Sequence, residues 1–224
     1  VMEFSKGRLG PLIEENIDSV GAYVKETNSA SMKNIWDTFL HMRGMKSKLS
    51  LKAVPADFIV FDELDEAEED MVDLAIKRLS HSKFKEIYML SNPTLPDYGI
   101  NKQFQNSDQR YWLLKCPKCN QYTCMEDTFP DCIAEFKDGR TIRLCQSCKD
   151  GELDPAVGQW VAKKPGITDR RGYHYSQLFA NDAYSKPSEI MSEFRTSAHL
   201  KVFYNMTIGV PYVSAENRLT VQDV

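Results

Sequence analysis

Two short apolar runs flank an amphipathic segment in the first half of the chain. Phe58-Ile59-Val60-Phe61 is rich in aromatic and β-branched residues, and it predicts a buried strand over 58–61. From Glu66 to Leu79, apolar residues recur at helical spacing, and acids crowd the first turns, where the helix dipole favours them. A second apolar run covers 87–90. A strand, a helix and a strand at this spacing predict a βαβ unit with a parallel sheet, and hence an α/β fold class.

The hydrophobic pattern elsewhere predicts shorter elements. They are a helix around 12–20, a turn that enters a short strand at 44–51, a strand over 173–179, a helix that starts at Pro187, and a last helix over 202–208 that ends at Gly209. Residues from about 111 to 160 contain all six cysteines and many turn residues. We therefore expect an α/β core that is interrupted by a metal-bound insert and resumes after it.

The composition is that of a soluble globular chain. Of its 224 residues, 42% are hydrophobic and 27% are charged, which excludes a disordered protein. No apolar run approaches the ~20 residues that a membrane helix needs. The sequence begins at Val1 without a secretory pattern, so we expect a piece of a longer chain whose cysteines are reduced in a cytosol.

The formal net charge of −4 is unevenly distributed. Eight carboxylates and no base lie between Asp62 and Asp73, and the remaining residues carry a formal charge of +4. A basic stretch contains Arg43, Lys46, Lys48 and Lys52. A contact of this stretch with DNA or with a neighbouring subunit's nucleotide competes with a solvated basic turn, and the total charge does not decide between them.

Two pairs of cysteines have the spacing of a metal site. CPKC at Cys116 and Cys119 is followed, after 25 residues, by CQSC at Cys145 and Cys148. Two residues between thiolates let both sulfurs of a tight turn face one ion, and two such turns complete a four-thiolate structural zinc site with no open position for catalysis. A rubredoxin-like iron has the same ligands, and two unrelated pairs of buried cysteines are the remaining alternative. Cys124 and Cys132 belong to no pair and are interpreted as buried or exposed free thiols.

The two apolar runs both end on polar side chains suited to phosphate chemistry. Asp62 and Glu63 follow the first run: an Asp at this place can hold Mg²⁺, and a Glu can orient an attacking water. Ser91, Asn92 and Thr94 follow the second run, where they can sense a γ-phosphate. The alternative is a strand that simply enters a solvated acidic helix. The sequence contains no phosphate-binding loop of the form GxxxxGK[ST]. We therefore expect that loop upstream of Val1, and we expect this chain alone to be inactive as an ATPase.

Taken in order, these segments resemble the large terminase subunit of tailed bacteriophages, specifically the lambda-type group whose ATPase domain contains a zinc insert. The resemblance covers about residues 39–212. It rests on the series RGMKSKLSLKAVPADFIVFDELDEA, MLSNPTLPDYGI, SDQRYWLLKCPKCNQ, LCQSC, GQW, GYHYSQLF and FYNMTIGVPY. The order and spacing of these segments are more specific than any one of them.

The resemblance implies a motor that hydrolyses ATP to drive double-stranded DNA into a procapsid, with a nuclease domain that cuts the DNA. It implies that Asp62 is the Walker B magnesium ligand, Glu63 the catalytic carboxylate, and Ser91, Asn92 and Thr94 the coupling motif, whose SNPT departs from the usual STP. The Walker A lysine and the nuclease aspartates have no counterpart here.

The implied fold is a partial P-loop (ASCE-type) parallel-sheet core with a zinc-ribbon-like insert. Residues 1–110 correspond to the core, 111–160 to the insert, and 161–224 to a return to the core with a linker starting near Leu219. The implied cofactors are structural zinc and, in the full-length protein, Mg-ATP. The implied partners are DNA, a terminase small subunit, a portal protein and further copies of the chain, in the cytoplasm of a bacterial host and without a membrane.

Two other functions stay open on the sequence alone. One is a non-catalytic zinc-ribbon module that binds nucleic acid or a protein. The other is a different ASCE-type DNA motor, such as a helicase, with a zinc insert. A phosphate-binding loop upstream separates the motors from the module, and a downstream nuclease-like acidic cluster separates a terminase from a helicase.

Overall fold

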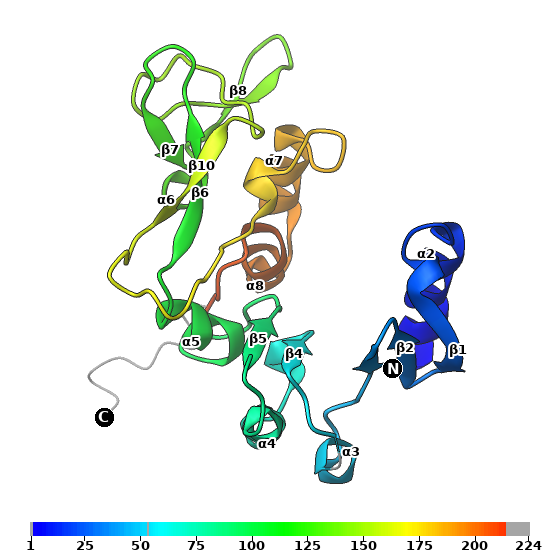
Figure 1. Cartoon of the computed structure of the whole chain (residues 1–224). Helices are drawn as coiled ribbons and strands as arrows, with labels where there is room; N and C mark the ends of the chain where they lie inside the picture. The colour runs from blue at the N-terminus through cyan, green and yellow to red at the C-terminus, as the bar shows by residue number, and fades with distance from the viewer. Residues whose placement is uncertain (1, 53, 214–224) are drawn as a thin grey trace, which may run out of the picture. The chain divides into compact units, whose positions relative to one another are not determined.

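The computed structural model of the chain describes residues 2–52 and 54–213 (Figure 1). They form two compact units. Of the described residues, the first unit contains those up to residue 60 and from 67 to 88, and the second contains residues 61–66 and 89–213. The expected linker near Leu219 lies outside the described residues, and the expected boundaries at 110 and 160 stay predictions.

The first unit begins with helical turns and a small meander of strands. Its helices are α1 (Met2–Phe4), a π-helix (Ser5–Leu9), α2 (Gly10–Glu15) and a 3₁₀ turn (Gly21–Tyr23). Its strands β1 (Val24–Ser29), β2 (Met32–Ile35) and β3 (Thr38–His41) form one antiparallel sheet in that order. The helix expected around 12–20 is thus confirmed only as far as Glu15.

The strand expected near 44–51 is wrong. The structure forms a short helix there, α3 (Lys48–Lys52), and buries only Leu51 of it, whereas Leu49 is exposed. The Ser50 hydroxyl donates hydrogen bonds to the carbonyls of Gly44 and Ser47 and so closes the turn before the helix. Alternation of leucines over so few residues does not distinguish a strand from one helical turn.

The predicted strand, helix and strand are confirmed as β4 (Phe58–Phe61), α4 (Glu69–Ile76) and β5 (Glu86–Met89), and a 3₁₀ turn (Lys77–Leu79) extends the helix. β4 and β5 pair with each other. The Glu86 amide donates to the Asp57 carbonyl, and the Leu90 amide donates to the Phe61 carbonyl. The sequence separation of donor and acceptor is the same in both bonds, as it is between parallel strands.

The burial expected of these strands is wrong for most of β4. Phe58 and Val60 are 52% and 51% exposed, and Tyr88 on β5 is 54% exposed, so of β4 only Phe61 is buried. The Phe58 and Tyr88 rings lie 5.0 Å apart and shield each other. Within the described part of the chain no third strand joins the pair. The fold is therefore a mixed α/β arrangement of small sheets with one short parallel pair.

The second unit is mostly antiparallel. Its strands β6 (Arg110–Lys115), β7 (Tyr122–Cys124) and β10 (Gly158–Ala162) form a sheet in the order β10-β6-β7, and β8 (Ile133–Glu135) pairs with β9 (Thr141–Arg143). Its helices are a 3₁₀ turn (Leu64–Glu66), α5 (Gly99–Gln105), α6 (Met125–Thr128), a 3₁₀ turn (Gln177–Phe179), α7 (Pro187–Thr196), α8 (Leu200–Phe203) and a π-turn (Tyr204–Ile208).

Two predicted helices of this unit are confirmed, and one predicted strand is wrong. α7 starts at Pro187, and the last helical turn ends at Gly209, whose φ of +74° is the left-handed conformation that favours glycine. Residues 173–179 form only a single bridge, between Tyr173 and Arg110, and a 3₁₀ turn. The alternating rings of Tyr173 and Tyr175 pack around Trp160, 5.2 and 5.1 Å away, which explains an alternation that does not produce a strand.

One hydrophobic core serves both the cysteine-rich region and the helices that follow it. Its residues from the cysteine-rich region include Leu114, Cys116, Met125, Cys132, Ile133, Cys145 and Leu153, and its later residues include Leu178, Ile190, Met191, Phe203 and Ile208. α7 packs against the β8–β9 hairpin (Figure 1). The cysteine-rich region therefore does not fold around cysteines alone, because later helices complete its core.

A buried glutamate attaches α6 to the returning segment. Glu126 accepts a hydrogen bond from the Ser176 hydroxyl at 2.6 Å, and His174 Nδ1 lies 3.6 Å from the same carboxylate oxygen. His174 Nε2 lies 2.9 Å from the Gly209 carbonyl oxygen. Burial raises the pKa of Glu126. The contacts with His174 and Ser176 together lower it by more than burial raises it, so the pKa lies below its ordinary value.

A buried arginine holds the segment after residue 177 to the β8–β9 hairpin. Arg143, which is 3% exposed, donates from Nε to the Leu178 carbonyl at 2.5 Å, and from Nη2 to the Ala180 carbonyl at 2.8 Å and the Ser185 carbonyl at 3.3 Å. Its Nη1 lies 2.5 Å from an Asp182 carboxylate oxygen. One planar guanidinium therefore supplies the hydrogen bonds of a whole irregular loop.

We expect Arg143→Lys to lower the free energy of unfolding by roughly 3 kcal/mol. A single ammonium cannot form all the hydrogen bonds of the guanidinium, and each hydrogen bond to a charged group contributes about 1.5–3 kcal/mol. Urea denaturation measures this. Arg140→Lys is the matched control, since the contacts of the Arg140 side chain, an ion pair with Asp138 and a position over the Phe136 ring, are both exposed, and it should change stability by less than about 1 kcal/mol. Equal effects of the two substitutions would contradict the role given to Arg143.

Candidate metal centre and strand-end loops

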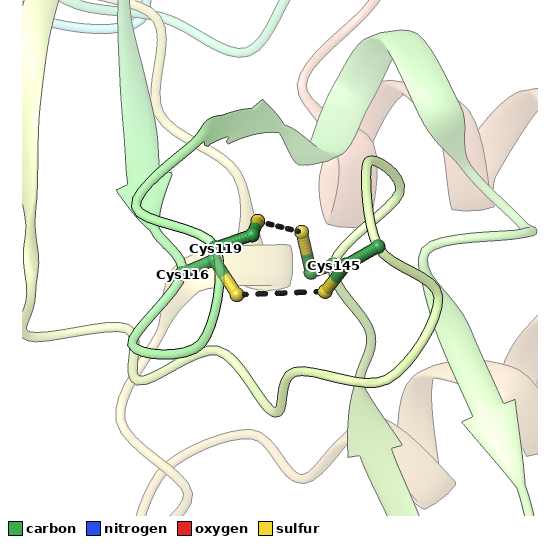
Figure 2. A group of neighbouring side chains, drawn as sticks. Cys116, Cys119 and Cys145 are labelled. Carbon is green, nitrogen blue, oxygen red and sulfur yellow. Dashed lines mark hydrogen bonds between the residues drawn. The ribbon is translucent and has the colours of Figure 1, made fainter.

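The four paired cysteines meet in one cluster. The sulfurs of Cys116, Cys119, Cys145 and Cys148 all lie within 4.8 Å of one another. The Sγ atoms of Cys116 and Cys148 are 3.8 Å apart, and those of Cys119 and Cys145 are 3.7 Å apart. Figure 2 shows sulfurs from the two turns pointing toward one another. A tetrahedral ion with metal–sulfur bonds of about 2.3 Å has sulfur–sulfur edges of about 3.8 Å, so the cluster fits such an ion.

The same backbone turn occurs twice and explains the spacing of the cysteines. The carbonyls of Cys116 and Cys145 each accept a hydrogen bond at 3.0 Å, from the amides of Asn120 and Lys149 respectively. Asn120 and Lys149 have φ values of 58° and 57°, and this left-handed residue reverses the chain after each pair. Each turn thereby directs two sulfurs to the same side.

Gly151 lets the second turn approach the first. A Cβ at this position would lie 2.3 Å from Cys116 Sγ, a distance that no side chain tolerates without moving the sulfur. Cys116 and Cys145 are fully buried. The Thr123 hydroxyl lies 3.9 Å from Cys145 Sγ, where it can donate to a thiolate. The cluster therefore lies in the interior of the fold, and Gly151 leaves space for the Cys116 sulfur.

The thiols of the cluster differ strongly in acidity. Burial raises the pKa of Cys145, but backbone amides of Cys148 and Ser147 and neighbouring thiols lower it to about 6. For Cys119 the Gln121 amide lowers the pKa, whereas burial and the neighbouring thiols raise it to about 12. A bound cation favours the thiolate form of closely spaced thiols, as in a four-thiolate metal site.

The two remaining cysteines lie outside the cluster. Cys132 is fully buried in the core, and Cys124 is half-buried beside Glu126. Burial raises the pKa of each thiol to about 12. Both cysteines are therefore free, un-ionised thiols outside the group of four described cysteines whose sulfurs converge.

Hydrogen bonds join the loops that follow the two parallel strands. The Leu64 amide donates to the Leu90 carbonyl at 3.1 Å, and the Asp65 amide donates to the Ser91 hydroxyl at 3.1 Å. Asp62 and Glu63 have exposed side chains at the start of the first loop. Glu63 has a φ of +53°, an unusual backbone conformation for a residue other than glycine, asparagine or aspartate.

Asp65 occupies the centre of this region, although the sequence did not single it out. It is 7% exposed, and its carboxylate accepts hydrogen bonds from the amide and the hydroxyl of Thr94 and from the amide of Ile100, each at 2.7 Å. Of the predicted coupling residues, Ser91 and Thr94 thus contact Asp65, whereas Asn92 is exposed. No sequence signal separates Asp65 from the neighbouring acids of the run, because only the fold buries it.

A cationic cleft lies in the first unit. Its walls are formed by Lys52, Pro55, Lys77, Arg78, Ser80 and His81, and none of them is a carboxylate. Arg78 Nη1 donates to the Lys52 carbonyl at 2.7 Å. Its buried Nε has no hydrogen-bond partner in the described part of the chain. Lys48, from the basic stretch noted in the sequence, forms an ion pair with Asp70, with 3.7 Å between Nζ and Oδ2.

The comparisons with known proteins give one match. The family model described as phage terminase large subunit gpA, ATPase domain, matches residues 1–153. No curated protein and no solved structure matches the chain. Across the described residues, every helix is too short or too polar to cross a membrane.

For the metal centre we expect elemental analysis to find about one zinc per chain, and a strong chelator to unfold the second unit. Gly151→Ala should weaken metal binding by about 10- to 100-fold, because its Cβ displaces Cys116 Sγ. Competition with a chromophoric chelator measures the affinity. Gly166→Ala is the control, since a Cβ there meets nothing within 4 Å. Protein purified without chelators but free of both zinc and iron would disprove the site.

Proposed function

The chain belongs to the family of the phage terminase large subunit gpA ATPase domain, and on that premise we propose that it is part of a motor that hydrolyses ATP to drive double-stranded DNA into a procapsid. The family itself places the chain in phage DNA packaging. The nature of the motor, its cofactors and its partners belong to the proposal. The observation on which it depends is the pair of hydrogen-bonded loops after β4 and β5.

These loops have the groups that ATP hydrolysis needs. In the proposed reaction Asp62 binds the magnesium of Mg-ATP, and Glu63 accepts a proton from the attacking water and orients it. The exposed side chains of both residues at the end of β4 support this assignment. Ser91, Asn92 and Thr94 are the proposed coupling residues, and the contacts of Ser91 and Thr94 with Asp65 support their placement beside the acidic loop.

We assign β4 and β5 to the parallel sheet of a P-loop (ASCE-type) core. Parallel sheets are normally covered on both faces, and a pair of strands is not stable by itself. The exposed rings of Phe58 and Tyr88 support a larger sheet around this pair. In this assignment residues 1–110 belong to the core, residues 111–160 form the insert, and residues 161–224 return to the core.

The proposed metal is zinc with a structural role. All four ligand positions are thiolates, so no position is left for a substrate. When bound, zinc supplies only charge neutralisation and cross-linking of the two turns. The fitted geometry supports any tetrahedral thiophilic ion, including iron, and metal analysis separates the two.

The proposed partners include double-stranded DNA, a terminase small subunit, a portal protein and further copies of the chain, in the cytoplasm of a bacterial host. For DNA, the cationic cleft gives physical support. Its lysines and arginine can neutralise backbone phosphates, and its lining has no carboxylate to bind the Mg²⁺ that accompanies a nucleotide.

Two alternatives remain for the function. A helicase-like motor has the same loops, and a nuclease activity in the full-length protein separates a terminase from it. A non-catalytic zinc module is less well supported, because it gives no role to the joined loops or to the left-handed Glu63.

In the full-length packaging protein, Glu63→Gln should reduce ATP turnover at least about 100-fold and leave nucleotide binding unchanged, because the amide cannot accept the proton of the attacking water. Single-turnover hydrolysis and nucleotide titration measure the two effects. Glu68→Gln, an exposed neighbour in the same acidic run, is the control. Near-normal turnover of the Glu63 variant would refute its catalytic role.

For the DNA contact, Lys77→Gln should weaken duplex binding equally for all sequences and reduce the slope of log affinity against log salt by about 1. Fluorescence anisotropy over a range of salt concentrations measures the slope. Lys137→Gln removes the same charge from an exposed position in the other unit and should leave the slope unchanged. If both variants have the wild-type slope, the cleft is not a DNA contact.

A further inference from the structure

The Asp65 side chain is surrounded by hydrogen-bond donors that all belong to the segment after β5. Oδ2 accepts from the amide and hydroxyl of Thr94, and Oδ1 accepts from the amide of Ile100, each at 2.7 Å. The Tyr98 hydroxyl adds a longer bond of 3.4 Å to the Asp65 carbonyl. The carboxylate therefore connects the acidic loop both to the coupling loop and to the start of α5.

The backbone around Asp65 is shaped to admit this carboxylate. Gly99 has a φ of +48°, and a Cβ there would lie 2.2 Å from Asp65 Oδ1. A side chain at residue 99 would thus expel the carboxylate. The donors that the described part of the chain directs at the Asp65 carboxylate are two backbone amides and one hydroxyl.

Asp65 lies two residues after Glu63, whose left-handed backbone needs support from its surroundings. Leu64, buried at 4% exposure, and Asp65 are both fixed to the loop after β5, whereas the side chains of Asp62 and Glu63 are free to meet a nucleotide. A movement of the Glu63 turn must therefore move Asp65, and with it Thr94.

Thr94 is also attached on its other side. Its carbonyl accepts a hydrogen bond at 3.3 Å from Asn205 Nδ2, in the π-turn that follows α8. Asn205 is 7% exposed. The connection from the acidic loop through Thr94 therefore reaches the last helical turn of the second unit.

We propose that Asp65 is the positioning residue that links the catalytic turn at Glu63 to the coupling loop at Thr94, so that a change of nucleotide state moves the two together. The inference rests on the proposed function. Asp65 touches neither nucleotide nor DNA in this role. A carboxylate is required because both of its oxygens face donors. An asparagine would turn a donating amide group toward either Thr94 or Ile100.

The test uses the full-length packaging protein and measures the length of DNA packaged per ATP hydrolysed. Asp65→Asn should lower this ratio by about tenfold while ATP turnover falls by less than about threefold. Glu66→Gln, an exposed acid next to it, should leave both quantities unchanged. A merely structural role for Asp65 lowers the active fraction, which reduces turnover and packaging in proportion and leaves the ratio unchanged.

A second pair of variants decides the question if Asp65→Asn does not fold. Thr94→Val removes the hydroxyl that donates to Asp65 and keeps the shape and the amide bond, whereas Thr94→Ser keeps the hydroxyl. The valine variant should have a lowered ratio and the serine variant should restore it. Faster amide exchange at Ile100 in Asp65→Asn is a further expected result.

The outcomes also separate this inference from the proposed function. If Glu63→Gln abolishes turnover but both Asp65→Asn and Thr94→Val keep the wild-type ratio, only the linking role of Asp65 is overturned. If Glu63→Gln retains turnover, the proposed ATPase site itself is wrong, whatever the ratio.

Discussion

Four sulfur atoms within 4.8 Å of one another bring two distant turns of this chain together. Cys116 and Cys145 are fully buried, and they share a core with Leu178, Phe203 and Ile208 from segments far along the chain. Thiolates this close repel one another unless a cation lies between them. The proposed metal would therefore support the packing of the later helices as well as the two turns that supply its ligands.

This arrangement connects the proposed structural metal site to the proposed chemistry without giving the metal a chemical role. Phe203 lies in the core that the cysteines share, and Asn205, two residues later, donates to the Thr94 carbonyl. Thr94 in turn donates to Asp65. A continuous series of packed and hydrogen-bonded residues thus runs from the cluster to the loop after β5. The proposed metal would thus help to hold the proposed coupling loop in place.

The sequence predicts the parts of this structure that local spacing determines. The cysteine spacing, the strand–helix–strand around α4, the start of α7 at Pro187 and the stop at Gly209 are of this kind. Prediction from the sequence fails where one hydrophobic pattern can arise from two different structures. The leucines of α3 alternate without a strand, and the aromatic alternation after residue 172 comes from rings packed on Trp160. Asp65 and Arg143 are not identifiable either, because long-range burial alone distinguishes them from exposed residues of the same type.

The exposed faces of β4 and β5 bear on the choice between a motor and a zinc module. A zinc module obtains its stability from metal and needs no parallel strands. This chain instead has a parallel pair whose Phe58, Val60 and Tyr88 side chains are about half exposed. Apolar residues on a parallel pair are stable only when neighbouring strands or helices cover them. An exposed parallel pair that ends in Asp62 and Ser91 therefore favours the proposed motor domain, in which it would be the edge of a larger sheet, over a self-contained zinc module.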